Sequence, residues 1–126
     1  MLLEALIAIL IFSMGILAMI GMQAKSISFV TDAMYRSEAS FLANEIIGQI
    51  WVDRANMATY AYPSGSSPAL TTWLGKVSNE LPGTTANPPT IAVDPATGRV
   101  TVTIRWQPPN ATVAHNYSAI ALVSNP

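Results

Sequence analysis

MLLEALIAILIFSMGILAMIGMQA, residues 1–24, opens the chain with a stretch in which Glu4 is the only charged side chain. A helix of this length reaches ~36 Å, enough to cross a hydrocarbon core of ~30 Å with some tilt. A secretory signal peptide would show a basic leading region and a small-residue cleavage site, which this stretch lacks. A buried core helix rarely stays free of charge for so long. The sequence therefore predicts a membrane-spanning helix over residues 1–24.

Glu4 is the exception within this helix. A carboxylate inside a bilayer costs ~2.5 to 3.5 kcal/mol on insertion scales, and such residues usually mark a function or a charged partner. Alternatively, Glu4 lies near the start of the helix and its side chain extends to the lipid headgroups. Both interpretations remain open from the residues alone.

Composition limits the remaining function classes. The 126 residues are 51% hydrophobic and 10% charged, which suits one small domain plus a membrane helix. The net charge is −1, and the six Lys and Arg are spread from Lys25 to Arg105, so no basic patch for nucleic acid is expected. The chain has no Cys, which excludes disulfides and thiolate metal sites. We expect neither a cofactor nor a metal.

The helix is predicted to continue well beyond the membrane segment. The first proline is Pro63, so one helix can run from Met1 to about Asp53 or Arg54 without a compulsory break. Gly15 and Gly21 are the expected weak points, because each costs ~1 kcal/mol relative to Ala in a helix interior.

Residues 25–54 carry charged residues and an apolar stripe at helical spacing. We expect this stripe to pack on a C-terminal sheet; its members are Ile27, Val30, Met34 and Phe41. Further along, apolar positions spread round most of the helix, covered either by the domain or by neighbouring subunits: Leu42, Ile46, Ile47, Ile50 and Trp51. Glu38 and Glu45 share one face and are either solvated or in a subunit contact.

Residues 55–89 are predicted to form a loop and a short helix. The loop is rich in Ser, Pro, Gly and Tyr. Ser67 as the cap and Pro68 at the first helical position indicate a helix start, and the helix should run to about Leu81. Its apolar face is formed by Leu70, Trp73, Leu74 and Val77.

Residues 90–126 are predicted to form antiparallel strands. Residues 90–93 and 99–106 flank a turn, residues 94–98, that contains Asp, Pro and Gly. In the second strand apolar residues alternate with Thr and Arg, which indicates one buried face. A third strand is expected from His115 to Val123. A small antiparallel sheet packed on a long helix is an α+β fold.

The start M-L-L-E-A-L-I-A-I-L-I-F, with a lone Glu followed by an apolar helix, resembles the mature N-terminus of type IV pilins and of type II secretion pseudopilins. The resemblance implies the pilin fold, a methylated terminus left by a prepilin peptidase, and a Glu that pairs with the terminal amine of a neighbouring subunit. Carried over, Glu4 is the assembly contact. In the family this Glu lies four residues after the processed terminus, whereas Glu4 lies three after Met1, so we expect one preceding residue or an unusual member.

Other fragments are similar to minor pilins of the PilV family, namely residues 9–24, R-S-E-A-S-F-L-A-N-E-I-I at 36–47, D-R-A-N at 53–56 and T-V-T-I-R-W-Q at 101–107. Family membership would imply a subunit that joins other minor pilins in a complex priming pilus assembly, often at the tip. Such a complex supports twitching motility, adhesion or DNA uptake. Expected partners are minor and major pilins, the assembly platform and a tip adhesin.

The resemblance also implies a location. The chain would lie in the bacterial inner membrane with a periplasmic domain, and then in an extracellular pilus. The residues expected to face lipid first and the filament core later are Leu2, Leu3, Leu6, Ile7, Ile9, Leu10, Ile11, Phe12, Ile16 and Leu17.

Enzymatic activity is not expected. The single His115 has no adjacent Cys and lies in a predicted strand, so it lacks the partners of a catalytic base. Two alternatives to a minor pilin stay open: a type II secretion pseudopilin, and a single-span membrane-anchored binding domain. In the last case Glu4 would be dispensable.

Overall fold

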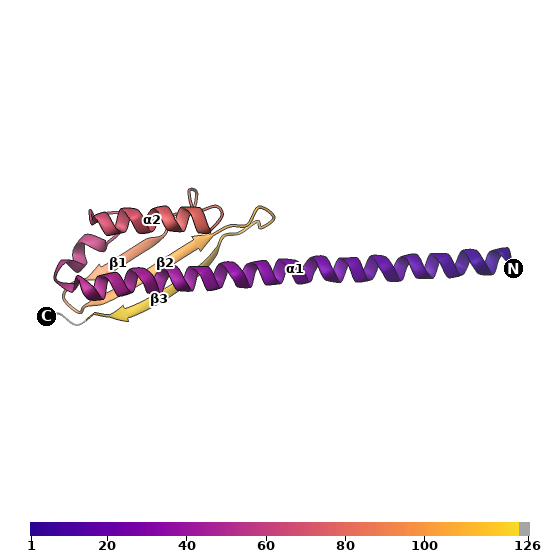
Figure 1. Cartoon of the computed structure of the whole chain (residues 1–126), viewed down its shortest axis with the longest axis horizontal. Helices are drawn as coiled ribbons and strands as arrows, with labels where there is room; N and C mark the ends of the chain where they lie inside the picture. The colour runs from indigo at the N-terminus through magenta and orange to yellow at the C-terminus, as the bar shows by residue number, and fades with distance from the viewer. Residues whose placement is uncertain (124–126) are drawn as a thin grey trace. The chain divides into compact units, whose positions relative to one another are not determined.

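The computed structural model describes residues 1–123. The helices are α1 (Leu2–Val52), the short 3-10 helix η1 (Arg54–Tyr60) and α2 (Pro68–Glu80), and the strands are β1 (Thr90–Asp94), β2 (Arg99–Trp106) and β3 (His115–Leu122) (Figure 1). The chain divides into two compact units, residues 1–34 and the part from Tyr35 onward. A long apolar helix and a small antiparallel sheet packed on it confirm the predicted α+β class, as in a pilin-like fold.

The sheet has the order β1-β2-β3, and both pairings are antiparallel. Val93 pairs with Val100 across the first hairpin, and Val102 pairs with Ala119 on the other side of β2. The predicted alternation is confirmed: one face of β2 is buried, formed by Val100, Val102, Ile104 and Trp106. Residues 124–126 of the predicted strand region lie outside the described residues.

The turn between β1 and β2 is held by Asp94 and Gly98. The Thr97 hydroxyl donates to Asp94 Oδ2 (2.9 Å) and the Ala96 N–H donates to Oδ1 (3.1 Å), and these bonds hold the pKa of Asp94 below its usual value. Gly98 has a φ of +74°, and a Cβ at this position would approach the Val123 carbonyl oxygen to 2.2 Å. Only glycine fits there without strain.

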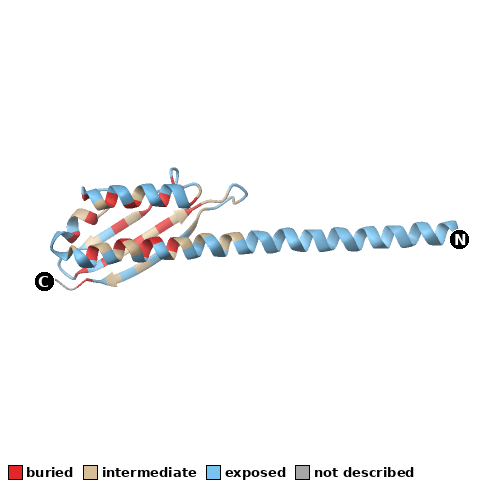
Figure 2. Cartoon of the chain, in the orientation of Figure 1, coloured by how far each residue is buried: buried red, intermediate tan, exposed pale blue. Residues whose placement is uncertain are grey.

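The core lies between α1, α2 and the sheet (Figure 2). Within residues 35–52, α1 buries one face made of small and branched side chains, namely Ala39, Leu42, Ala43, Ile46 and Ile50. From α2 the core receives Leu70, Trp73 and Val77, three of the four residues predicted for its apolar face, while Leu74 is half-buried against the core.

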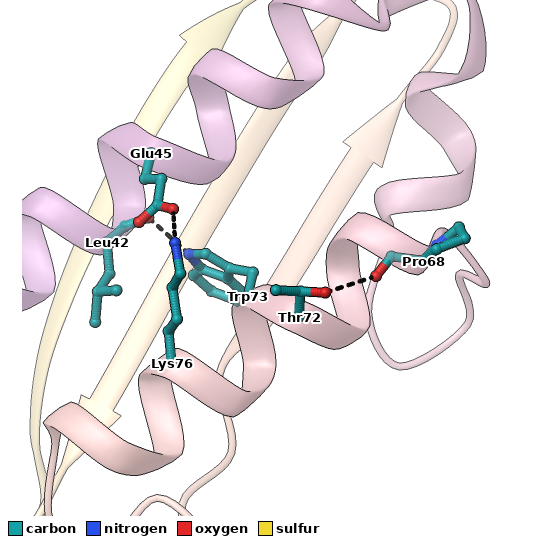
Figure 3. A network of polar contacts seen from close by, with 6 residues as sticks. All are labelled: Leu42, Glu45, Pro68, Thr72, Trp73 and Lys76. Atoms are coloured by element: carbon teal, nitrogen blue, oxygen red, sulfur yellow. Dashed lines mark hydrogen bonds and ion pairs between the residues drawn. The ribbon is translucent and has the colours of Figure 1, made fainter.

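Two side chains of α2 fasten it to α1. The Trp73 indole N–H donates to the backbone carbonyl of Leu42 (2.8 Å), and Lys76 forms an ion pair with Glu45 (Figure 3). The first bond is fully buried, so it satisfies a donor that would otherwise be costly to bury. Glu45, one of the two glutamates left open by the sequence, therefore makes its ion pair within the chain.

The predicted packing stripe is wrong. All four of its members, Ile27, Val30, Met34 and Phe41, are exposed, and Phe41 is 64% exposed. The buried face lies on nearly the opposite side of the helix and is formed by Ala39, Leu42, Ala43, Ile46 and Ile50. Helical spacing indicates which residues share a face, but not which face packs on the rest of the domain.

Element boundaries differ slightly from prediction. α1 ends at Val52, and part of the predicted loop forms η1, which buries Met57 and Tyr60. The Ser67-Pro68 start of α2 is confirmed and α2 ends at Glu80. Ser67 occupies the cap position, but its side chain makes no capping bond; its backbone N–H donates to the Thr59 carbonyl (3.1 Å).

Tyr60 makes stability depend on pH in the alkaline range. Burial raises the pKa of Tyr60 above its ordinary value of 10.0, and its hydrogen bond to Asp53 Oδ2 (3.2 Å) acts in the same direction. Because the folded-state pKa is raised, this contribution to the free energy of unfolding is complete below pH 10.0 and is lost as the pH rises through the raised pKa. We expect Tyr60→Phe to reduce the alkaline loss of stability, measured by urea unfolding between pH 8 and 12.

The control for this experiment is Tyr62→Phe, which removes a hydroxyl from a neighbouring half-buried tyrosine. It should keep the alkaline loss of the unmodified chain. An identical alkaline loss in Tyr60→Phe and in the unmodified chain would contradict the prediction.

Candidate functional site

Within the first unit, residues 2–24 form a helical segment that is apolar on every side apart from Glu4. Within the described residues, α1 is the one helix long and apolar enough to cross a membrane, and none of its most apolar window is buried. Successive residues of a helix lie ~100° apart, so Ile9, Leu10, Ile11 and Phe12 together cover the whole circumference. All ten residues predicted to face lipid are exposed: Leu2, Leu3, Leu6, Ile7, Ile9, Leu10, Ile11, Phe12, Ile16 and Leu17. Such a surface requires an apolar cover.

Two hydroxyl side chains on α1 donate hydrogen bonds to backbone carbonyls of the same helix. Ser13 Oγ donates to the Ile9 carbonyl (2.8 Å), and Thr31 Oγ1 donates to the Ile27 carbonyl (2.8 Å). A bond to the carbonyl four residues earlier needs neither water nor a neighbouring side chain. These hydroxyls are therefore compatible with an apolar surrounding, where water is not available to pair with them.

Glu4 lies in the first turn of α1, and its side chain is exposed. It forms no ion pair with any of residues 1–123. The next charged side chain along the helix is Lys25, at a distance of ~30 Å for twenty-one residues. The positive end of the helix dipole favours a carboxylate here by only ~0.3 to 1 kcal/mol. A full counter-charge for Glu4 must therefore come from outside its own helix.

Gly15 and Gly21, the predicted weak points, lie within regular α-helix, and α1 is continuous from Leu2 to Val52. A Cβ added at either glycine would meet no other atom within 4 Å. Neither glycine is needed for packing within the chain. Whether the helix bends there in its working surroundings stays a prediction, as does the membrane boundary near residue 24.

The second unit also exposes apolar side chains of α1. Phe41, Trp51 and Val52 project away from the core and are exposed by 64%, 41% and 90%. Of the residues for which the sequence left two covers open, Leu42, Ile46 and Ile50 are buried in the domain, and Ile47 is partly buried against it. Glu38 is half-buried.

Sequence reasoning missed an aromatic stack at one end of the sheet. The ring of Trp106 lies 5.9 Å from that of His115 at an interplanar angle of 16°, and the Arg36 guanidinium carbon lies 5.6 Å from the Trp106 centroid. These residues come from β2, β3 and α1. Alternation along β2 indicated that Trp106 points inward, but no local pattern could indicate its two partners. In this stack the His115 ring packs against the ring of Trp106.

A shallow groove of about 620 Å³ runs between α1 and α2, lined by Glu45, Gly48, Gln49, Val52, Asp53, Tyr60, Ala69 and Thr72. Its acidic groups are already engaged: Glu45 pairs with Lys76, and Asp53 accepts hydrogen bonds from Asn56 and Tyr60. Across residues 1–123, no group of three or more His, Cys, Asp and Glu is placed to hold a metal ion.

Comparison with known proteins found no matching family model, no similar curated protein and no similar solved structure. The features of the molecule that indicate its function are the exposed apolar helix, Glu4 and the uncovered side chains of the domain.

Adjacent residues Leu42 and Phe41 test which face of α1 packs within the domain. We expect Leu42→Ala to lower the free energy of unfolding by ~2 to 5 kcal/mol, because it opens a cavity in the core. Phe41→Ala should change it by no more than ~0.5 kcal/mol, because its ring is largely exposed. Urea unfolding of the full chain in detergent measures both values. Similar losses in the two variants would contradict the assigned face.

Proposed function

We propose that the chain is a minor type IV pilin, a structural subunit whose apolar helix lies in a membrane before assembly and in the core of a filament afterwards. The observation that carries this proposal is the combination of a segment that is apolar on all sides, residues 2–24, with one carboxylate, Glu4, whose nearest cationic side chain along the helix, Lys25, is ~30 Å away. A simple membrane anchor needs the first property but has no use for the second.

On assembly, protein replaces lipid around the apolar helix. In a bilayer, hydrocarbon covers the exposed side chains of residues 2–24; in a filament, the same helices of neighbouring subunits cover them. Both surroundings are apolar, so the hydrophobic side chains favour neither strongly. A carboxylate favours the one that supplies a cation, because a buried unpaired charge is far more costly than a paired one. The terminal ammonium of a neighbouring subunit is the proposed partner of Glu4.

The proposal includes a location and a set of partners. The helix is held in the bacterial inner membrane, the domain lies in the periplasm, and the assembled subunit is part of an extracellular pilus. Its partners are other minor pilins, the major pilin, the assembly platform and a tip adhesin. The complex primes pilus assembly and supports twitching motility, adhesion or DNA uptake. The domain has a structural role in it and no catalytic one.

A type II secretion pseudopilin would use the same helix and the same carboxylate. Copurification separates the two systems: a minor pilin associates with pilus subunits, whereas a pseudopilin associates with components of the secretion machinery. Association with the secretion machinery alone would replace the proposed system while keeping the filament mechanism.

The test of the mechanism is Glu4→Gln, which keeps the size of the side chain and removes its charge. We expect the variant to reach the membrane at normal levels, while its amount in sheared filaments falls at least about tenfold because the charge pair is lost. Quantitative immunoblots of membrane and filament fractions measure both amounts.

The matched control is Glu80→Gln, which removes the charge of an exposed carboxylate at the end of α2. It should enter filaments normally. Normal incorporation of Glu4→Gln would refute the proposal and favour a membrane-anchored binding domain, in which Glu4 is dispensable.

A further inference from the structure

The uncharged part of α1 is bounded by one charged residue at each end. Residues 5–24 carry no charge, and they lie between Glu4 and Lys25. Along a helix these two residues are ~30 Å apart. The hydrocarbon core of a typical bilayer is also ~30 Å thick. When residues 5–24 fill the hydrocarbon, the two charged side chains therefore lie in the two headgroup layers, one on each side of the bilayer.

Within the chain, Lys25 has no close anionic partner. Its side chain is exposed, and it forms no ion pair with any of residues 1–123. The next carboxylate along the helix belongs to Asp32, two turns further on at ~10 Å. At physiological ionic strength the Debye length is ~8 Å, so Asp32 neutralises Lys25 only weakly. In a headgroup layer the nearest anions to Lys25 are the phosphates of the lipids.

The residues at both ends of this span oppose a change of depth. If the hydrocarbon covered residues 9–28 instead, Leu6 and Ile7 would leave it and Lys25 would enter it. Leu and Ile favour hydrocarbon on insertion scales, whereas Lys strongly disfavours it. A shift in the other direction would bring in Glu4, which is disfavoured for the same reason. A displacement in either direction therefore moves a charged side chain toward hydrocarbon.

The same depth accounts for exposed apolar residues just beyond Lys25. Ile27, Phe29 and Val30 are exposed by 67%, 73% and 69%. They lie ~3 to 8 Å further along the helix than Lys25. Each headgroup layer adds ~5 to 7 Å to the hydrocarbon core, so these side chains lie within the layer or at its outer boundary. At this depth they can contact the ends of the acyl chains, as apolar side chains of interfacial helices do.

We propose that Lys25 binds the phosphate groups of membrane lipids, and that Lys25 and Glu4 together fix the depth of α1 in the bilayer. Residues 5–24 lie in the hydrocarbon, with Glu4 in one headgroup layer and residues 25–30 in the other. The midplane of the bilayer lies midway between the two charges, next to Met14. Both statements rest on the membrane helix of the proposed function.

Nitroxide labels measure this depth directly. The chain contains no Cys, so a single cysteine can be introduced and labelled without removing others. Three exposed positions, at spacings of three and four residues, lie on one face of the helix and give the variants Ile11→Cys, Met14→Cys and Ala18→Cys. Each full-length labelled variant is placed in liposomes of palmitoyl-oleoyl phosphatidylcholine. Collision rates of the label with oxygen and with a water-soluble nickel complex give its depth.

We expect the label at Met14 to be the deepest. The labels at Ile11 and Ala18 should be equally deep, each ~5 Å from the midplane, because they are equidistant from it. Lys25→Met extends the uncharged stretch to Thr31 and should move the midplane ~5 Å toward Ala18. Lys25→Arg is the matched control, which keeps the charge and should leave all three depths unchanged.

The phosphate contact has a separate measurement. Lys25 and Lys76 are the only lysines of the chain, so ¹⁵N at lysine Nζ gives two signals in solid-state NMR, and Lys25→Met identifies the first. Lipid ³¹P should dephase the Lys25 signal and leave the Lys76 signal unchanged, because Lys76 pairs with Glu45 in the domain. An unchanged Lys76 signal in Lys25→Met also shows that the domain is folded.

Several outcomes would overturn the proposal: a label at Ile11 or Ala18 that is deeper than the one at Met14, unchanged depths in Lys25→Met, or no dephasing of Lys25 by lipid ³¹P. None of them would affect the proposed function, which is tested by Glu4→Gln in filaments. If all three labels were fully accessible to the nickel complex, the membrane helix itself would be wrong, and both proposals would fail.

Discussion

The constraint that governs the structure is that one helix must be covered in two different ways. Over residues 2–24 α1 is apolar on all sides, and none of its most apolar window is buried by residues 1–123. From about Ala39 onward one face of the same helix is buried against the sheet and α2. The change follows from composition: large apolar side chains surround the first part, whereas in the second part charged and polar residues leave one apolar face, which is buried.

Polar bonds fix how the domain closes on that face. The Trp73 indole donates to a main-chain carbonyl of α1, and Lys76 reaches Glu45 one turn further along. Tyr60 fastens η1 to Asp53 just past the end of α1, and Tyr62 extends the connection to Ile91 of β1. In this way hydrogen bonds join the segment between the two helices to Asp53 and to β1, while Met57 and Tyr60 are buried in the core. No cysteine takes part, because the chain has none.

Local patterns in the sequence predicted what depends on neighbours along the chain. The absence of proline before Pro63 indicated the length of α1, Ser67-Pro68 marked the start of α2, and alternation along β2 identified its buried face. Predictions failed where distant residues decide. The Phe41 stripe was wrong because contacts with α2 and the sheet decide which face of α1 is buried, and η1 was missed because burial of Met57 and Tyr60 in the core stabilises it. The aromatic stack of Arg36, Trp106 and His115 joins three elements, and any counter-charge for Glu4 lies outside its helix.

The continuity of α1 has a mechanical consequence. Every interior amide of the helix is already bonded to a carbonyl four residues earlier, and Ser13 and Thr31 use the same acceptors. Moving α1 from one apolar surrounding to another therefore breaks no backbone hydrogen bond and exposes no amide. Under the proposed function α1 therefore moves as one preformed helix, and within residues 2–24 Glu4 is the one charged side chain that both surroundings must accommodate.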